Sequence, residues 1–583
     1  MFILAPVTDR FVFCLSHSTQ PRLIPPSRGP AGKANIEFTF PVESEEEEEL
    51  RLNFKWNPQY MSSLRGEQPV VLSNPDGTGS PRIELLMYAT PHHQDRMEAA
   101  IGSSNVISDW GCVPTIHGTA CPVTGDFWCM VEHLHRTGFH AQHPIREEMV
   151  PDLQKALKSD IHFTIDDNYM NGAGDTYFSG KMLGKLARIL LIAEEIGLDA
   201  DGATGGVTKK DFNDALDRLR AGTTIWLNGK AESPLLYDAS WGGIVMCGCD
   251  YNDQTGKCNN QFPDCPALTD AGSNFGAGFY NDHHFHFGYH ILAAAVVARF
   301  DHAWGRKYFQ RALMLVRDIA NPSVMDPFFP TWRHKDWYLG FSWASGIVTI
   351  QGEPYPNGRN QESSSEAISA YESVALFGES FASIFRKSAM PAEKALLDVA
   401  TRIKDMGRLL LATEIRSAKT YWHVQQPNTS GVARVYPNNY SPKVVGMIWS
   451  MLAQQQTWFG NEPWKSYGIQ LMPLTPVAQQ RDSPSWIREM LPLFKESCYS
   501  DPECVTQGWS IVILSSMAVI GEWKNARDEA LKLSPDVFFS AGGNGHSLSN
   551  TLWYIATRPV PSAEDYALGN RYPVQLNSFE API

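Results

Sequence analysis

The chain of 583 residues carries a formal net charge of −14, and 43% of its residues are hydrophobic while 19% are charged. This length and composition are typical of a globular protein with about two to four domains. The negative charge disfavours nucleic acid and anionic membranes as partners, and no stretch predicts a membrane-spanning helix. We therefore expect neither as a partner, and we expect a monomer.

The N-terminal region predicts strands after an irregular start. Residues 1–34 are rich in Pro, Ser and Arg and predict a disordered or wrongly assigned N-terminus. Asp9 and Arg10 interrupt its apolar beginning, so it contains no clear signal peptide. Residues 35–100 predict part of a β-sandwich, because they contain the strand-like runs Ile36–Phe40, Leu50–Trp56 and Ile83–Tyr88. Residues 101–170 then predict a small mixed α/β linker domain with a helix near 147–157.

Nine of the ten cysteines gather in three groups, and Cys14 stands apart. The groups are Cys247, Cys249, Cys258 and Cys265, then Cys498 and Cys504, then Cys112, Cys121 and Cys129. Their spacing matches no common zinc pattern, so disulfides that close loops of a secreted protein are favoured. The pairing cannot be deduced from the spacing. Cysteine use therefore predicts an extracellular or cell-wall location, with which the missing signal peptide disagrees.

From residue 171 onward the sequence predicts one helix after another. Asp175–Gly197 is the clearest, because Leu183, Leu186 and Leu190 form an apolar stripe and the final glycine is a stop signal. An uninterrupted run of about ten helices predicts a helical toroid or a bundle, and the pattern does not separate the two. The other predicted helices are 210–227, 305–319, 362–377, 379–385 after a break at Gly378, 391–413, 443–455, 484–494, 508–520 and 523–532.

The first of two acidic stretches is Tyr280–His290, which precedes an apolar, helix-like run. Asn281 or Asp282 is expected at the N-cap, where its side chain would accept from the N–H groups of the first turn. Asp282 and His286 are four residues apart and then share a helix face. Considered alone, Asp282 is more often an ordinary N-cap than a catalytic group. His286 and His290 have the spacing of a metal-ligand pair, but no third ligand is marked, so hydrogen bonding is the plainer role.

The second acidic stretch is Asn360–Ala367, in which Glu362 and Glu366 are four residues apart. As isolated glutamates they would be exposed residues at a helix start, stabilised by the helix dipole. The serines between them suit a cleft better than a core, and two carboxyl groups this close should couple, so that one pKa rises relative to the other. Two acidic stretches that are distant in sequence fit general acid/base hydrolysis of a sugar bond.

A third stretch, Asp326–Gly346, combines charges of both signs with several aromatic rings. Its plainer interpretation is a packed connector. A sugar-binding site needs flat apolar faces beside groups that bond hydroxyls, and this stretch offers both. We therefore expect four of its residues in substrate subsites, namely His334, Asp336, Trp337 and Trp343.

Together, these three stretches resemble glycoside hydrolase family 81, the endo-1,3-β-glucanases, in order and spacing, and the resemblance extends from about Pro91 to about Pro476. It implies a mainly α fold, with an (α/α)6 barrel over residues 171–583 and a cleft at one rim. A shortened β-sandwich and the linker domain would precede this barrel. The implied activity is endo-acting hydrolysis of 1,3-β-glucan with inversion of configuration.

The resemblance also implies roles for individual residues. Asp282 matches the general acid, Glu362 matches the base that activates water, and Glu366 matches an assisting carboxylate. His286 supports Asp282, and two further residues of the matched runs are expected to bind substrate, Tyr289 and Asn360. Inverting sites hold acid and base about 6.5–9.5 Å apart, so we expect the two reacting carboxyl groups within that range. Because carboxyl groups can perform both proton transfers, we expect no metal and no cofactor.

Two alternatives stay open at this point. A polysaccharide lyase on a similar toroid would need an acidic substrate and usually a basic cleft, which the net charge of −14 argues against. A non-catalytic glucan-binding protein would keep the aromatic residues and tolerate loss of Asp282 or Glu362. The sequence has no P-loop, nucleophile elbow or dinucleotide fingerprint, so nucleotide, acyl-transfer and NAD chemistry lack support.

Overall fold

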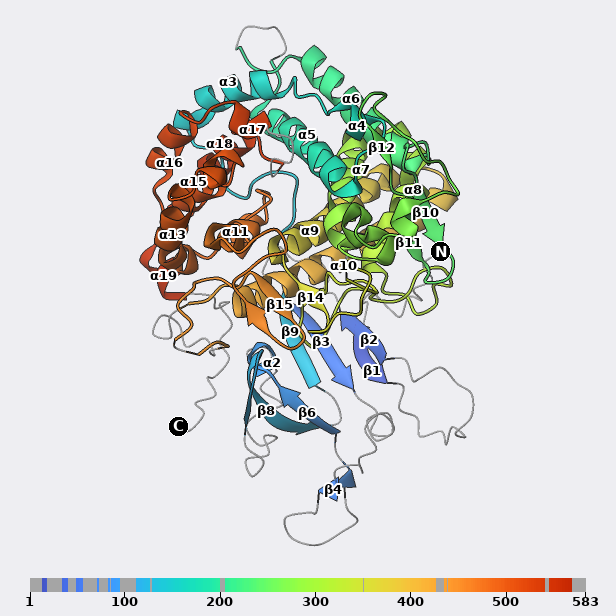
Figure 1. The fold of residues 1–583 in the computed structure, drawn as a ribbon, viewed down its shortest axis with the longest axis vertical. Coiled ribbons are helices and arrows are strands. Elements are labelled where there is room, and N and C mark those ends of the chain that lie inside the picture. Colours follow the sequence, from blue (N-terminus) through green and yellow to red (C-terminus); the bar gives the residue numbers. More distant parts are fainter. Residues whose placement is uncertain are drawn as a thin grey trace. The chain divides into compact units, whose positions relative to one another are not determined.

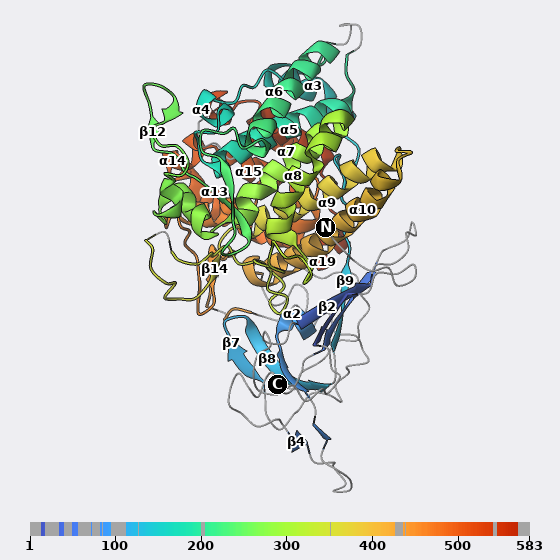
Figure 2. The same ribbon diagram turned by 90° about the vertical axis from the view of Figure 1, so that its right-hand side faces the viewer.

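The computed structural model describes residues 112–125, 128–199, 205–349, 351–425, 435–437, 439–539 and 545–568, preceded by the segments 13–17, 34–39, 49–55, 71–72, 82–83 and 85–94. The chain divides into two compact units, both drawn in Figure 1 and Figure 2. The larger unit contains His135–Thr429 and Pro442–Asn570, and the smaller unit contains Leu4–Leu134.

The smaller unit contains short β-sheets. One sheet has the strand order β1, β2, β3, β9, with the bounds Phe13–His17, Ala34–Thr39, Glu49–Lys55 and Trp128–His133. An antiparallel sheet has the order β6, β8, β7, with the bounds Leu85–Ala89, Gly118–Gly125 and Val113–Thr115, and β4 (Val71–Leu72) pairs with β5 (Arg82–Ile83). The predicted strand segments are confirmed by β2, β3 and β5 with β6. Of residues 1–34, the structure describes only β1 and Ala34. The prediction of disorder for the other residues of this segment falls outside the described residues.

In the larger unit the helices follow one another round a ring (Figure 1). Helices α5, α7 and α9 pack side by side, and each has a neighbour that follows it in sequence, namely α6, α8 and α10. The bounds of α5 to α10 are Thr176–Ile196, Lys209–Leu227, His283–Phe300, His302–Ala320, Ser364–Arg386 and Pro391–Ser417. The unit is mainly helical, as predicted.

The second half of the ring is built from shorter helices. These are α11 (Pro463–Ile469), α13 (Pro484–Tyr499), α15 (Ser510–Val519), α16 (Trp523–Ala530) and α18 (Leu548–Thr557). Helix α18 packs against both α5 and α3 (Val150–Asp160), which closes the ring. The predicted helices near 147–157, 484–494, 508–520 and 523–532 are therefore confirmed.

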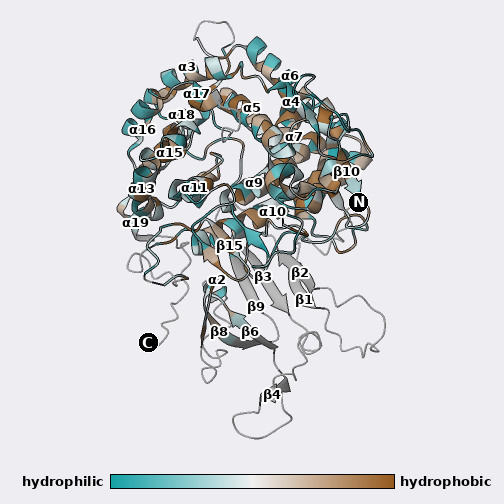
Figure 3. Cartoon of the chain, viewed as in Figure 1, coloured by the Kyte–Doolittle hydropathy of each residue, from teal (hydrophilic) through white to brown (hydrophobic). Residues whose placement is uncertain are grey.

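Burial separates the helices that face the centre of the ring from those that face outward. Every residue from His283 to Ala298 in α7 is buried, and a helix buried all round belongs in a core. In contrast, α16 buries only Ala526 and Ala530 and is largely hydrophilic in Figure 3. Side-chain caps fix where inner helices begin, since Asp175 accepts a hydrogen bond from Phe178 N and starts α5.

The predicted helix break at Gly378 is wrong, because α9 runs without interruption from Ser364 to Arg386. A Cβ atom at Gly378 would lie 2.3 Å from the backbone nitrogen of Lys404 on α10. The glycine therefore allows two helix backbones to approach closely, which is a packing requirement that local sequence does not reveal.

The predicted helix over 443–455 is also wrong. This segment contains β15 (Met447–Trp449) and β16 (Ala453–Gln454), and β15 pairs with β14 (Asn360–Gln361) in an antiparallel sheet. Pairing with a strand distant in sequence overrides the local helical pattern. As a consequence, β14 is held just before Glu362.

In the part of the chain that the structure describes, four disulfides close short loops, as the cysteine groups predict. They join Cys112 to Cys121, Cys247 to Cys265, Cys249 to Cys258, and Cys498 to Cys504. Among the described residues, no helix is both long enough and apolar enough to cross a bilayer.

Candidate active site

A cavity of about 690 Å³ is lined by residues from the first turns of α5, α7 and α9 and from the loops that face them. Its polar lining includes Lys181, Asn281, Asp282, His286, Ser345, Tyr355, Asn360, Glu362 and Glu366. Its aromatic lining includes Tyr177, Phe178, Phe275, Phe285, Trp458, Phe459 and Trp509. The fold thus brings the two acidic stretches of the sequence to one aromatic-lined cavity.

Asp282 stands at the N-cap position of α7, as predicted, but its side chain makes no capping hydrogen bond. Its backbone is left-handed, with φ 59° and ψ 17°, a conformation that is strained for a residue other than glycine. Backbone hydrogen bonds hold it there, since Asp282 N donates to Ala344 O at 2.9 Å and Asp282 O accepts from the N–H groups of Phe285 and His286. The carboxyl group is therefore not engaged in capping the helix and lines the cavity.

The environment of Asp282 favours its protonated form. Burial raises the pKa of this carboxyl group well above its usual range, and the neighbouring Glu362 and Glu366 raise it further. No capping hydrogen bond from helix N–H groups acts in the opposite direction. Asp282 is thus suited to hold a proton near neutral pH and to donate it.

Glu362 lies between β14 and α9, and its Oε1 accepts a hydrogen bond from Trp458 N at 2.6 Å. Burial raises the pKa of Glu362 to about 7, while the Trp458 N–H acts to lower it and Glu366 acts to raise it. A carboxyl group with this pKa is available in its ionised form near neutral pH and can accept a proton from water.

Glu366 is more tightly enclosed than the other two carboxyl groups. It lies in the first turn of α9, where Ser363 Oγ accepts from its backbone N–H at 3.3 Å. Its Oε1 accepts hydrogen bonds from Tyr177 Oη at 2.9 Å and from Tyr289 Oη at 2.7 Å. Lys181 Nζ lies 3.8 Å from the same oxygen. Two hydrogen bonds and this nearby ammonium group on one oxygen fix the orientation of the Glu366 carboxyl group.

The histidines of the first stretch are hydrogen-bonded in the wall of the cavity. His286 lines the cavity, and its Nδ1 lies 2.6 Å from Thr176 Oγ1. His290 Nε2 lies 2.9 Å from the carbonyl oxygen of the same threonine. Burial lowers the pKa of His286 well below its usual value, so its ring is neutral. These contacts agree with the hydrogen-bonding role that the sequence favours.

One group of described residues has the ligand atoms for a metal ion: His283, Asp318 and His334, whose atoms lie within 4.8 Å of one another. His283 Nδ1 lies 2.6 Å from Asp318 Oδ2, and His283 Nε2 lies 2.7 Å from the carbonyl oxygen of Ala277. Both ring nitrogens of His283 thus have hydrogen-bond partners, and its short contact with Asp318 is that of a hydrogen-bonded pair. None of the three is among the described residues that line the cavity.

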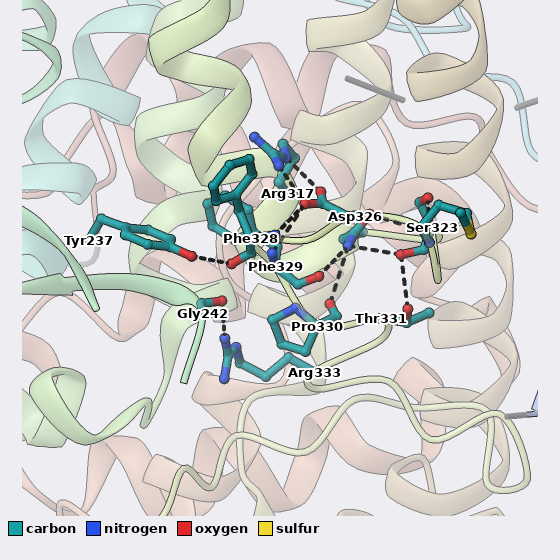
Figure 4. A network of polar contacts seen from close by, with 12 residues as sticks. Tyr237, Gly242, Arg317, Ser323, Asp326, Phe328, Phe329, Pro330, Thr331 and Arg333 are labelled. Atoms are coloured by element: carbon teal, nitrogen blue, oxygen red, sulfur yellow. Dashed lines mark hydrogen bonds and ion pairs between the residues drawn. The ribbon is translucent and has the colours of Figure 1, made fainter. Parts of the chain in front are cut away.

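The third stretch contributes to packing in this structure. Figure 4 shows Asp326 paired with Arg317, at 2.6 Å and 2.8 Å, and accepting from the N–H groups of Phe328 and Phe329. Arg333 donates to Gly242 O at 2.6 Å in the same view. The contacts tie the stretch to α8 and to the loop before β11 (Gly243–Met246).

The four residues of that stretch predicted in substrate subsites are not among the described residues that line the cavity. His334, Trp337 and Trp343 are buried, with exposed fractions of 1%, 7% and 4%. Trp343 Nε1 donates to Asp336 Oδ2 at 3.1 Å, so these two residues bond to each other. Of the two other residues expected to bind substrate, Asn360 lines the cavity, whereas Tyr289 contacts Glu366 behind it.

Sequence reasoning did not identify Tyr177 and Lys181 as site residues. Both lie on α5, four residues apart, so they share the face that meets the cavity. A signal was present, because a lysine in a predicted core helix is unusual unless it has a partner.

The fold and the site define a helical-barrel protein in which paired carboxyl groups face one aromatic-lined cavity. Residues 144–555 match the family model described as the glycosyl hydrolase family 81 C-terminal domain. The chain belongs to this family, which confirms the resemblance seen in the sequence.

Curated relatives carry the name glucan endo-1,3-beta-D-glucosidase. The protein from Glycine max is 29% identical and matches 82% of this chain and 62% of its own length. The protein from Arthroderma benhamiae is 28% identical and matches 82% of this chain and 47% of its own length. A solved structure of a glycoside hydrolase family 81 protein from Clostridium thermocellum has a TM-score of 0.59 at 21% identity, covering 82% of this chain and 56% of that one. This chain spans about half the length of the relatives it matches.

Proposed function

We propose that this protein is an endo-acting, inverting hydrolase of 1,3-β-D-glucosidic linkages in 1,3-β-glucan such as laminarin or cell-wall glucan. The observation that carries this proposal is the pair Asp282 and Glu362, which come from distant segments and face one cavity. Their environments suit opposite tasks, since Asp282 holds a proton and Glu362 can ionise near neutral pH. Membership of family 81 and the names of the relatives support the same substrate.

In the proposed reaction, Asp282 donates its proton to the glycosidic oxygen as the bond to the anomeric carbon breaks. Glu362 takes a proton from a water molecule that attacks the opposite face of that carbon. The Trp458 N–H, 2.6 Å from Glu362 Oε1, orients the base. The cycle ends with Asp282 ionised and Glu362 protonated, and exchange with solvent restores both. We expect the two carboxyl groups to lie about 6.5–9.5 Å apart, which leaves room for the water.

Other residues of the cavity wall support these two. Glu366, held by hydrogen bonds from Tyr177 and Tyr289, adds to the field that keeps the proton on Asp282. His286 is neutral and hydrogen-bonded to Thr176, and this contact helps to hold the start of α7 beside Asp282. Phe275 and Trp458, which are 42% and 44% exposed, offer ring faces to the apolar C–H faces of glucose units, and Asn360 offers hydrogen bonds to hydroxyls. We also propose that His334, Asp336, Trp337 and Trp343 contribute to substrate subsites.

We further propose a specific barrel architecture, an N-terminal sandwich, and a location and oligomeric state for this protein. Within the described residues, six pairs of helices support an (α/α)6 barrel, namely α5 with α6, α7 with α8, α9 with α10, α11 with α13, α15 with α16, and α18 with α3. The sheets of the smaller unit support a shortened β-sandwich followed by a linker domain. Four disulfides support an extracellular or cell-wall location, and we propose that the protein acts as a monomer without a metal or cofactor.

The test is NMR of the anomeric protons that form in the first minutes of reaction on a linear 1,3-β-glucan oligosaccharide, with Asp282→Asn as the control. Initial α-anomer that is absent in the control would support inverting hydrolysis through Asp282. Initial β-anomer would contradict inversion and the base role of Glu362. Binding of the oligosaccharide without any product would favour a non-catalytic glucan-binding protein.

A further inference from the structure

The mechanism above assigns no role to the ammonium group of Lys181. This residue lies on α5 and lines the cavity, although it is only 3% exposed. Its Nζ lies 3.8 Å from Glu366 Oε1 and 4.1 Å from the centre of the Tyr177 ring. Burying an ammonium group is costly unless an opposite charge compensates for it. The position of Lys181 therefore indicates a specific electrostatic task.

The charges around the cavity define this task. Among the described lining residues, Lys181 is the cation that faces three carboxyl groups, Asp282, Glu362 and Glu366. Catalysis requires that Asp282 keep its proton while Glu362 loses its own. An ionised Glu366 without a counter-charge would hold protons on both of the others, because like charges in a buried site repel. Glu362 could then no longer serve as a base near neutral pH.

We propose that Lys181 is a positioning residue whose ammonium balances the charge of Glu366, so that Glu362 can ionise while Asp282 stays protonated. This inference rests on the proposed hydrolysis and adds a residue to its machinery. Lys181 acts on Glu362 in the required direction, since its charge lowers the pKa of that carboxyl group. The pKa of Asp282 is raised by burial, Glu362 and Glu366.

Lys181 is surrounded by titratable groups from several elements. Burial lowers the pKa of its ammonium, and Glu366, Asp175 and Glu362 act to raise it. The groups that face Lys181 or Glu362 are Asp175 and Tyr177 at the start of α5, Asp282 and His286 at the start of α7, Tyr289 within α7, Glu366 on α9, and His546 before α18. Since burial lowers the pKa of His546 to about 3 and that of His286 well below its usual value, neither ring competes with Lys181 as a cation near neutral pH.

The chain offers a matched control one turn further along α5. Lys185 is also buried, at 5% exposed, and its Nζ lies 4.3 Å from the centre of the Phe163 ring. Its Nζ donates to the carbonyl oxygen of Phe538. Among the carboxylates near it, Asp160 raises its pKa most. Lys185 is not among the described lining residues of the cavity. Replacing it removes an equally buried charge from the same helix without touching the three carboxyl groups.

The experiment measures kcat/KM against pH on a linear 1,3-β-glucan oligosaccharide for the full chain and for Lys181→Met, Lys181→Arg and Lys185→Met. We expect Lys181→Met to move the acid limb upward by about one pH unit, which is a tenfold loss at a fixed pH below the midpoint. Lys181→Arg and Lys185→Met should keep the acid limb of the unsubstituted protein. An unmoved acid limb in Lys181→Met would overturn the inference.

A second readout needs no activity. Infrared difference spectra follow the carboxyl C=O band of Glu362, identified by its absence in Glu362→Gln, as pH is raised. The midpoint of this band should rise by about one pH unit in Lys181→Met and stay unchanged in Lys185→Met. An unchanged midpoint in Lys181→Met refutes the role of Lys181 even if that variant is inactive. Failure of the unsubstituted protein to hydrolyse the oligosaccharide would instead refute the proposed function, and the infrared titration would still decide the role of Lys181.

Discussion

Replacing Glu362 with glutamine should stabilise the protein above neutral pH while it abolishes hydrolysis. Burial raises the pKa of Glu362 from an ordinary value of 4.5 to about 7. The folded protein therefore binds this proton more tightly than the unfolded chain does. The resulting stabilisation is fully present below about pH 4.5 and is lost as pH rises through about 7. The difference between the two pKa values corresponds to about 3 kcal/mol, and glutamine, which keeps the shape without the charge, avoids this loss.

The assay is urea denaturation of both proteins between about pH 4.5 and pH 8. The free energies of unfolding should be similar at the lower pH, and the Glu362→Gln variant should be more stable by about 3 kcal/mol at the upper pH. A gain of stability on losing a reactive group is typical of an active site, where function requires a group in an unfavourable environment.

Glu372, which lies within α9, offers a matched control. Burial raises its pKa to about 7 as well, and its Oε1 accepts from Val477 N at 3.2 Å. It is not among the described lining residues of the cavity. Glu372→Gln should show a similar dependence of stability on pH and should keep hydrolytic activity. A stability difference for Glu362→Gln that stays constant from about pH 4.5 to pH 8 would refute the reasoning.

Three further predictions follow from the site and the packing. Because Glu362 must be ionised, kcat/KM should fall about tenfold for each pH unit below about 7, and an assay of new reducing ends that found no such fall would contradict its role as base. Gly378→Ala should destabilise the protein by about 1–3 kcal/mol in urea, since its Cβ would meet Lys404 N at 2.3 Å and the clash outweighs the gain of about 1 kcal/mol from helix propensity. Dialysis against a chelator should leave hydrolysis unchanged, because carboxyl groups perform both proton transfers; loss of activity that zinc or manganese restores would point to the group of His283, Asp318 and His334.

Local sequence determined the elements whose signals lie within a few residues. The helix α5 could be predicted from its apolar stripe and its final glycine, and the carboxyl groups of Asp282, Glu362 and Glu366 could be identified from two short stretches. The cysteine groups indicated disulfides because each pair closes a short loop. Periodicity, caps and short loops are local properties, so no tertiary information was needed.

Tertiary structure decided the features that depend on residues far apart in the chain. The segment 443–455 forms strands because it pairs with Asn360–Gln361, and Gly378 continues α9 because α10 approaches it closely. Asp282 avoids capping its helix because a contact with Ala344 helps to hold its backbone left-handed. Lys181 belongs to the site because α5 packs against α7, and α7 packs against α9, which together place its ammonium beside Glu366. Burial and neighbouring charge, which set the pKa of each carboxyl group, arise only when these distant segments meet.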